Sequence, residues 1–460
     1  MKKILYLPIE IKKRELLPKL FLGLSALKKG FNFVIGNKTS IFAATNFFGP
    51  GIYFYKSMNF NDTNHIRKIK KKNNIYVVHD EESGVTHSTS KTLNNFINIR
   101  SSEKNLKLID RFYTWGNFDH NAWIKKYQRY QNKFKMTGSP RLDLCMPKIN
   151  EYFLSDEIKE IKKKYKKYIL FISSGISSDV ELKNIFKQDK FFFRYKNKIE
   201  KLNRIEQMKN LRKYFVNSIN LINCISKNFN DINIVIRPHP NENLKDWKKE
   251  INQFNKNVIL DSSDKDIASL IKNSECVIHN SSFSGIQASL LNKPIIVFSP
   301  KKINLNKRSF PNKLGIKANS EKEVCQLIKK LVFFKYRFNK KKILKQTLSR
   351  VNYTIDKTAS DKIINDFSKF KINKFYKDDL KINFFSRFLF LKNFLRKKIN
   401  LKNHNSSRRY TRRTMSEKLG GGIFKDDIYK YIRALRKKNK DLGNVVVRSF
   451  GPNGFYISKK

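Results

Sequence analysis

The sequence predicts an α/β fold with two domains, each built around a parallel sheet. Four short, nearly continuous apolar runs in the second half are typical of strands that are buried on both faces. They cover residues 232–236, 258–260, 276–278 and 295–298, and helical patterns lie between them at residues 244–254, 267–271 and 286–291. This alternation indicates a doubly wound sheet, in which ligands bind just beyond the carboxyl ends of the strands.

The first half of the chain carries a second, independent alternation of the same kind. Apolar runs predict strands at residues 4–9, 31–35, 52–55, 75–78, 112–115 and 134–136. Leucine and phenylalanine at helical spacing over residues 16–27 predict a helix that stops at Gly30. At 460 residues, the chain exceeds one ordinary core. We therefore expect one domain over residues 1–147 and another over residues 155–345, with a hinge between them.

The C-terminal part of the sequence has a different character. A crossover segment at residues 346–378 is expected to return to the first domain through a helix over 343–370, and residues 379–460 form a basic tail. Aromatic residues interleave with Arg and Lys over residues 382–401. This pattern fits a basic amphipathic helix on an anionic membrane surface, and it equally fits a terminal helix packed on the body. Residues 403–422 have the composition of a flexible linker, and residues 423–460 fit a small helix with a hairpin.

The chain is strongly basic. It has 97 Lys+Arg against 38 Asp+Glu, a formal net charge of +59. Such an excess attracts polyanions: nucleic acid, acidic lipid headgroups or phosphorylated substrates. Lys, Asn, Ile and Phe are all frequent together, which A/T-biased codon usage also explains. No RNP-type aromatic motif, zinc-finger spacing or helix-turn-helix signal is present, so no specific nucleic-acid partner is expected.

The cysteine pattern and the apolar runs limit the compartment and the metal chemistry. The four cysteines are far apart and form no C-x-x-C motif, which indicates a reducing compartment and no metal site. The first apolar run is too short for a signal-peptide core, and no run approaches the length of a membrane span. We expect a cytoplasmic protein that can lie peripherally on the inner face of the membrane.

Small polar residues follow the predicted strands of the second domain. Arg237 and His239 lie in the sequence R-P-H-P, directly after one strand. Two serine clusters follow other strands, and they comprise Ser173, Ser174, Ser281, Ser282 and Ser284. Hydroxyls and free backbone N–H groups at the start of a helix suit an anion such as phosphate. The alternatives remain open that the serines merely cap the helix and that His239 is structural.

An acidic cluster follows the strand predicted at residues 75–78. Asp80, Glu81 and Glu82 are adjacent, and neighbouring carboxylates raise one another's pKa toward the working range of a general base. The alternative is a solvated acidic turn. Glu10 and Arg14, beyond the first strand, are weaker candidates for the same acceptor-side site.

These stretches, in this order, resemble a known motif set. The supporting sequences are L-P-I-E-I-K-K-R-E-L, D-E-E-S-G, T-G-S-P-R-L-D, R-P-H-P and H-N-S-S-F-S-G-I-Q-A, which together span roughly residues 1–300. Two Rossmann-like domains facing a cleft resemble the GT-B glycosyltransferase architecture. The acidic, His-Pro and serine-pair motifs resemble those of bacterial sialyltransferases and retaining Kdo transferases, and the chain looks most like surface carbohydrate biosynthesis proteins.

The resemblance implies transfer of a sugar from a nucleotide-sugar, with a CMP-linked donor expected, to a surface polysaccharide or lipid-linked glycan. His239 would contact the donor phosphate, Ser281 and Ser282 would hold it, and one of the three carboxylates would activate the acceptor hydroxyl. Gln287 stands where these enzymes often have a Glu that grips the ribose. The nucleotide-sugar is then the substrate, no cofactor is needed, and no D-x-D metal motif is present where it would be expected.

Other interpretations stay open. The R-P-H-P and serine motifs also resemble CDP-glycerol polyol-phosphate transferases, and the T-G-S-P stretch resembles non-hydrolysing UDP-GlcNAc 2-epimerases. A different class is a basic module that binds RNA or membranes, with the α/β core as an inert scaffold.

Overall fold

The structure of the chain is a computed structural model, and it describes residues 3–82, 84–175, 182–183, 198–239, 242–251, 256–301, 303, 309–334, 338–372, 419–438, 442–450 and 453–460. The chain divides into two compact units. The first comprises Met1–Val85, Thr89–Asp156 and Leu348–Lys460, and the second comprises Thr86–Ser88 and Glu157–Thr347. The amphipathic segment expected at residues 382–401 lies outside the described residues.

A sheet of eight described strands forms the centre of the first unit. Its strands are β1 Lys3–Ile9, β2 Phe31–Asn37, β3 Ile52–Tyr55, β4 Ile75–His79, β5 Arg111–Thr114, β6 Phe134–Met136, β13 Val445–Ser449 and β14 Gly454–Lys459. Their order is β13-β14-β2-β1-β3-β4-β5-β6, and the six strands from β2 to β6 along this order pair in parallel. The six strands predicted in the first half of the sequence are therefore confirmed.

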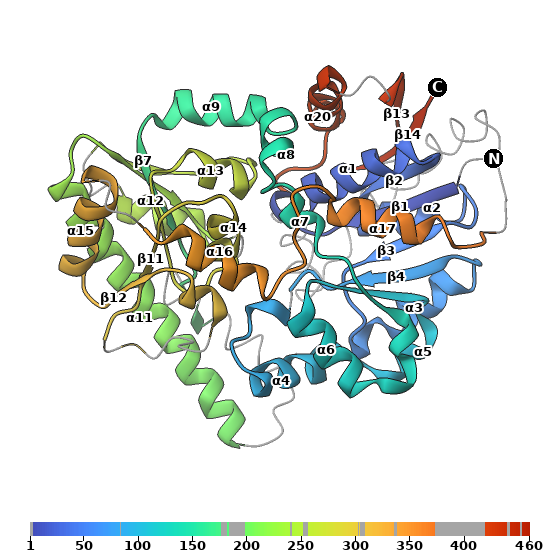
Figure 1. The fold of residues 1–460 in the computed structure, drawn as a ribbon, viewed down its shortest axis with the longest axis horizontal. Helices are drawn as coiled ribbons and strands as arrows, with labels where there is room; N and C mark the ends of the chain where they lie inside the picture. The colour runs from blue at the N-terminus through green and yellow to red at the C-terminus, as the bar shows by residue number, and fades with distance from the viewer. Residues whose placement is uncertain are drawn as a thin grey trace, which may run out of the picture. The chain divides into compact units, whose positions relative to one another are not determined.

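Helices cover this first sheet. They are α1 Lys12–Lys28, α2 Lys38–Ala44, α3 Thr63–Lys70, α4 Ser90–Arg100, α5 Glu103–Leu108, α6 Asn117–Lys126, α7 Pro140–Asp143, α8 Pro147–Tyr152, α17 Ala359–Phe367 and α20 Lys425–Lys438. Helix α1 is buried along most of its length, which explains its nearly all-round apolar sequence. Helix α17, far away in the sequence, packs beside α1 (Figure 1).

The last strands correct the expectation for residues 379–460. The helix and hairpin expected over residues 423–460 are present as α20, β13 and β14. They are not a separate tail, because β14 pairs antiparallel with β2 and extends the first sheet, as the red hairpin beside β2 in Figure 1 shows. The contact requires a glycine, because a Cβ on Gly36 would lie 2.1 Å from the carbonyl oxygen of Asn453. Asn453 itself has φ of 58° and accepts a hydrogen bond from Ile423 N through Oδ1. The C-terminal hairpin is thus part of the first unit's core.

The crossover expected as one helix over residues 343–370 is two helices. Helix α16, Lys340–Leu348, ends before a loop, and α17 begins at Ala359. The loop is held by tertiary contacts, because Asn352 N donates to the carbonyl of Trp115 at 2.7 Å and a Cβ on Gly138, at φ +86°, would lie 2.2 Å from Asn352 O. Asp143 then caps α17 by accepting from Ala359 N and Ser360 N at 2.7 and 2.9 Å. The T-G-S-P-R-L-D stretch therefore serves the packing of this crossover.

A second sheet of six described strands, all parallel, forms the centre of the second unit. The strands are β7 Tyr168–Ile172, β8 Asn233–Arg237, β9 Val258–Leu260, β10 Val277–His279, β11 Ile295–Phe298 and β12 Ile316–Ala318. Their order is β12-β11-β10-β7-β8-β9. The accompanying helices are α9 Ser155–Tyr165, α11 Lys198–Asn228, α12 Leu244–Ile251, α13 Ile267–Asn273, α14 Ser284–Leu290, α15 Glu321–Ile328 and α16, with the 3₁₀ turn η4 Phe310–Lys313. The predicted α/β fold class with two parallel sheets is confirmed.

Each sheet is buried by large side chains, as the continuous apolar runs require. In the first unit, Tyr53 stacks on Tyr76 with ring centroids 5.6 Å apart. In the second, Phe215 of α11 meets Trp247 of α12 edge-on at 4.6 Å. These aromatic pairs hold helices and neighbouring strands at fixed spacing, so the loops at the strand ends start from rigid elements.

Two fully buried histidines make stability depend on pH. Burial lowers the pKa of His79 and of His279 to about 4 in each case. In the unfolded chain the two histidines are protonated near pH 6.5, but in the folded chain they stay neutral down to about pH 4. The contribution of the neutral histidines to the free energy of unfolding is therefore fully present above pH 6.5 and is lost as the pH falls toward 4. Between pH 7 and pH 5 we expect each histidine to lower the free energy of unfolding of its unit by about 2 kcal/mol.

Thermal unfolding at pH 7 and pH 5 checks this expectation. His279→Gln should flatten the pH dependence of the second unit, whereas His239→Ala, at an exposed position, should leave it as in the wild type. Equal slopes for all three proteins would contradict the assignment.

Candidate functional site

In the first unit, three neighbouring strands end in charged residues. Strands β1, β3 and β4 are adjacent in the sheet, and they are followed by Glu10, Lys56 and the Asp80–Glu82 cluster. Because the strands are parallel, these residues meet at one sheet edge. Lys56 Nζ lies 2.6 Å from Glu10 Oε2 and 4.0 Å from Glu15 Oε1.

Glu15 and Lys19 form the buried centre of this cluster. Both lie on α1, one turn apart, and both are almost fully buried. Glu15 accepts hydrogen bonds from the backbone N–H groups of Glu10 and Ile11 and from Lys19 Nζ, the last at 2.9 Å. Burial alone would raise the pKa of Glu15, but the charges of Lys19 and Lys56 outweigh it and lower the pKa to about 2. Glu15 is therefore a fixed negative charge.

Glu81 is the carboxylate that this centre holds in place. Its side chain is 6% exposed, and Oε1 lies 3.7 Å from Lys19 Nζ, which also donates to the carbonyl of Pro8 at 2.7 Å. Its other oxygen, Oε2, is buried and has no hydrogen-bond partner among the described residues. Most buried acceptors have a hydrogen-bond partner, so this oxygen is open to a water molecule or to a ligand group. Of the three predicted acids, Glu81 is thus the one with an acceptor atom to spare.

Asp80 and Glu82, predicted beside Glu81 as catalytic acids, are engaged differently. Asp80 forms a bidentate pair with Arg100 of α4, with distances of 3.0 Å from Nε to Oδ2 and 2.8 Å from Nη2 to Oδ1. It also accepts from Glu82 N at 2.9 Å, so both its oxygens are used to shape the turn. Glu82 is exposed and lies 3.3 Å from Arg14, the other weak candidate. The structure therefore gives Asp80 a structural contact in place of the predicted catalytic role.

In the second unit, hydrogen bonds join three neighbouring strand ends. Strands β8, β7 and β10 are adjacent, and their ends carry the R-P-H-P stretch, the Ser173-Ser174 pair and the serine loop at residues 280–285. Ser173 Oγ donates to Glu242 Oε1 at 2.8 Å, and Ser174 Oγ donates to the carbonyl of Asn280 at 3.1 Å. The predicted phosphate-binding stretches thus share one edge, but these two hydroxyls link loops to each other.

Glu242, which the sequence analysis did not single out, fixes the loop that carries His239. It is buried and accepts from His239 N at 3.1 Å and from Trp247 Nε1 at 2.9 Å, besides Ser173. His239 itself is exposed, so its imidazole stands at the surface on a backbone that Glu242 holds. The available signal was an acid placed three residues after the histidine in a predicted loop.

Arg237 corrects a prediction. It was expected to bind phosphate, but its guanidinium is buried and pairs with Asp261, Nη1 to Oδ2 at 2.5 Å. The same group donates to the carbonyls of Ser263 and Lys265, both at 2.8 Å. Its side chain therefore ties the loop after β9 to the end of β8, and a phosphate would have to compete with a charge-assisted bond.

The serine loop is shaped by an asparagine from η4. Ser281 has φ of 54°, and its N–H donates to Asn312 Oδ1 at 2.6 Å. Asn312 Nδ2 donates in turn to Ser281 Oγ at 3.1 Å. Ser282 Oγ accepts from Ser284 N at 3.2 Å, so it satisfies one N–H group at the start of α14, whose N-cap residue is Phe283. Asn312 was not visible as a partner in the sequence because it lies on a separate turn.

Two buried polar side chains under this loop lack partners among the described residues. They are His279, at both ring nitrogens, and Gln287, at Oε1. A Cβ on Gly285 would lie 2.5 Å from His279 Nε2, so only glycine fits between the loop and the ring. Gln287, predicted to contact the ribose, is 2% exposed, so its side chain is buried where α14 packs on the sheet.

The contacts of Glu242 predict a specific effect on donor use. Glu242→Ala removes the carboxylate that accepts three hydrogen bonds, so the His239 loop loses its anchor. We expect KM for the nucleotide-sugar to rise roughly 10-fold while kcat changes less. Glu242→Gln is the matched control: its Oε1 can still accept from both N–H groups, and its amide can donate to Ser173 Oγ. Steady-state kinetics of both variants check this, and equal KM values for Glu242→Ala and the wild type would contradict it.

Part of the second unit matches a known family. Residues 212–300 match the family model described as "Capsule polysaccharide biosynthesis protein". The segment runs from α11 through β11 and contains both the R-P-H-P stretch and the serine loop. No curated protein sequence matches the chain.

Solved structures with the same architecture are similar over most of the chain. The wall teichoic acid polymerase TagF superposes with a TM-score of 0.51 at 14% identity, over 80% of this chain and 89% of that chain. Its H444N variant gives 0.52 at 14% identity, over 80% and 88%. This is a GT-B-like fold. A UDP-GlcNAc 2-epimerase from Neisseria meningitidis bound to UDP-GlcNAc gives a TM-score of 0.47 at 13% identity, over 80% and 99%. The resemblance to surface carbohydrate biosynthesis proteins of GT-B-like fold is confirmed.

Two features are absent from the described residues, a cluster of metal ligands and a membrane-spanning helix. No three or more His, Cys, Asp or Glu side chains are grouped there so that they could hold a metal ion. None of the helices described there is long and apolar enough to cross a membrane.

Proposed function

We propose that the chain is a glycosyltransferase of surface polysaccharide synthesis, which moves a sugar from a nucleotide donor to a glycan or lipid-linked acceptor. The single observation that carries this proposal is the capsule polysaccharide match over residues 212–300. That segment contains both candidate donor-binding motifs, and they follow β8 and β10, the two strands that flank β7 in one sheet. Ligands of doubly wound sheets bind at such ends.

The proposed donor site uses His239 and the serine loop. The exposed imidazole of His239 contacts the donor phosphate and stabilises the departing nucleotide, and the loop at Ser281 and Ser282 holds the same phosphate. Arg237 is paired with Asp261, so in this proposal His239 supplies the positive charge that stabilises the phosphate.

The proposed acceptor site uses Glu81. Lys19 fixes one of its carboxylate oxygens, and the unpartnered Oε2 accepts the proton of the acceptor hydroxyl as that oxygen attacks the sugar. Glu15 forms an ion pair with Lys19 and offsets its positive charge. Lys19 can therefore orient Glu81 while the group of three side chains keeps a net negative charge.

For the donor we propose a CMP-linked sugar, such as Kdo or a sialic-acid-like sugar. The motif resemblance supports this choice. A second candidate is transfer of a polyol phosphate from a CDP-polyol, because the fold is similar to that of a teichoic acid polymerase and the R-P-H-P and serine motifs resemble such transferases.

Incubation with a panel of nucleotide-sugars and detection of released nucleotide tests the proposal. We expect release from one class of nucleotide-sugar, and His239→Ala should lower kcat roughly 100-fold because the leaving phosphate loses its main contact. His65→Ala, at a partly buried histidine on helix α3, is the control and should retain the wild-type rate. Release from CDP-glycerol alone would favour the second candidate, and full turnover in His239→Ala would overturn the assigned mechanism.

A further inference from the structure

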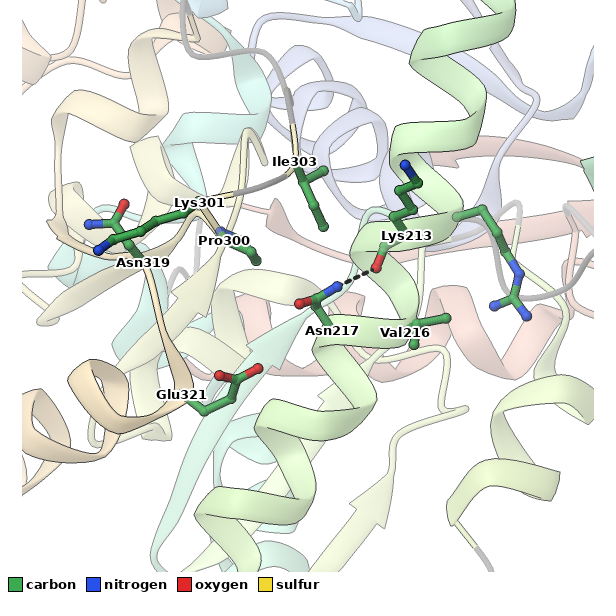
Figure 2. Close-up of a pocket in the computed structure, with 9 residues that line it drawn as sticks. Lys213, Val216, Asn217, Pro300, Lys301, Ile303, Asn319 and Glu321 are labelled. Atoms are coloured by element: carbon green, nitrogen blue, oxygen red, sulfur yellow. Dashed lines mark hydrogen bonds between the residues drawn. The ribbon is translucent and has the colours of Figure 1, made fainter.

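A pocket lined by charged, amide and apolar side chains lies in the second unit, and none of these residues is used above. It has a volume of about 580 Å³, within the range of about 300–1,000 Å³ that is usual for small-molecule sites. One wall is α11, and the other is formed by the loops that follow β11 and β12. Figure 2 shows Lys213, Val216 and Asn217 on that helix and Pro300 and Lys301 on the facing loop.

The fold places this pocket at the ligand-binding edge of the sheet. Strands β11 and β12 run parallel to β10, so their carboxyl ends lie at the same edge as the serine loop. Asn280 Nδ2 donates to the carbonyl of Phe298, the last residue of β11, at 2.7 Å. Pro300 follows two residues later and lines the pocket. The pocket is thus separated from the R-P-H-P end of β8 by β7 and β10, because β11 is the third strand from β8 in the sheet order.

The charges around the pocket favour an anion. Three cationic side chains line it, Arg212, Lys213 and Lys301, against one carboxylate, Glu321. Neither the Lys213 nor the Lys301 ammonium group forms a hydrogen bond or an ion pair with any described residue. Cations that have no carboxylate partner and line a concave surface attract a negatively charged ligand.

The remaining lining suits a sugar ring. Pro300 and Ile303 are buried and give the pocket an apolar base, against which the C–H face of a ring can pack. Two amides, Asn217 and Asn319, border it. Asn217 Nδ2 donates to the carbonyl of Lys213 at 2.9 Å, drawn as the dashed line in Figure 2, so its Oδ1 is left to accept from a hydroxyl.

We infer that this pocket binds a saccharide unit that carries an anionic group, either a carboxylate or a phosphate, separately from the donor nucleotide. Lys213 and Lys301 pair with the anionic group, and the amides bind the ring hydroxyls. The inference rests on the proposed function in one respect: it identifies the ligand as part of an acidic glycan. Binding at this pocket requires no turnover, so it is measured independently of the transfer reaction.

Calorimetric titration of the full chain tests the inference with three probes: glucose 6-phosphate, glucuronate and glucose. We expect at least one anionic probe to bind at least 10-fold more tightly than glucose, and the better of the two identifies the anion. The charge-reversal pair Lys213→Glu/Lys301→Glu should weaken that probe at least 10-fold. Lys272→Glu, at an exposed lysine of α13, is the matched control and should leave it unchanged.

Three results would overturn the inference. The first is equal affinity for glucose and for both anionic probes, and the second is undiminished binding of the anionic probe by the charge-reversal variant. The third is that CMP, CDP or UDP displaces the probe and that the charge-reversal variant also binds this nucleotide more weakly. The last result would assign the pocket to the donor nucleotide. If the wild type and the variant both released nucleotide normally but bound no anionic sugar, the pocket would fail while the proposed function stood.

Discussion

Replacing Glu81 by glutamine is expected to lower kcat roughly 10²–10⁴-fold with little change in folding. Glutamine keeps the shape of the side chain, and its carbonyl can still face Lys19, but it cannot take a proton from the acceptor hydroxyl. Release of nucleotide in the presence of acceptor measures the loss, and thermal unfolding shows whether the fold is retained. Because Glu81 is proposed to act on the acceptor, donor binding should stay within a few-fold of the wild type.

Glu82→Gln is the matched control for this experiment. Glu82 is the neighbouring acid, but its side chain is 50% exposed and that of its partner Arg14 is 21% exposed, and ion pairs at the surface contribute little. We expect its kcat to remain within about 3-fold of the wild type. Comparable losses in both variants, or full activity in Glu81→Gln, would show that Glu81 is not the base.

Replacing Lys19 by methionine is expected to destabilise the first unit by roughly 3–5 kcal/mol at pH 7, because it leaves two buried carboxylates without their shared cation. In the wild type, Glu15 has its pKa lowered to about 2, against about 4.3 when unfolded. The stability that this shift contributes is present above pH 4.3 and is lost as the pH falls toward 2. Without Lys19 the pKa of Glu15 rises, so the destabilisation should shrink when the pH is lowered from 7 to 5.

Thermal unfolding of three variants separates this effect from a general loss of packing. Lys19→Met/Glu15→Gln removes one of the two carboxylates and should recover part of the stability at pH 7. Lys29→Met, at the exposed end of α1, should behave like the wild type. A Lys19→Met protein as stable as the wild type at pH 7 would refute the buried network.

The sheets could be predicted from the sequence because strands buried on both faces must be apolar at every position. The runs predicted at residues 75–78, 232–236 and 276–278 are found in β4, β8 and β10, and the polar clusters after them do lie at sheet edges. The C-terminal hairpin was expected, but its place in the first sheet could not be predicted, since nothing local to residues 445–459 indicates that β14 pairs with β2. The break between α16 and α17 likewise depends on contacts with Trp115 and Gly138.

The roles within each cluster were harder to predict than the clusters themselves. Asp80 and Glu81 are adjacent in the sequence, yet one turns to Arg100 and the other to Lys19, and sequence adjacency carries no information about such partners. Arg237 was assigned to phosphate because it stands at a strand end, but Asp261 from the next strand's loop takes its charge. Pairing across a sheet edge is decided by strand order, which only the structure gives.

The central claim is that a nucleotide donor binds at the ends of β8, β7 and β10 through His239 and the serine loop. Calorimetric titration of the whole chain with CMP, CDP and UDP, repeated with His239→Ala/Ser282→Ala, tests it most directly. The account predicts that a cytidine nucleotide binds the wild type with Kd below about 1 mM and that the double variant binds it at least 10-fold more weakly. No binding by the wild type, or equal binding by the double variant, would contradict it.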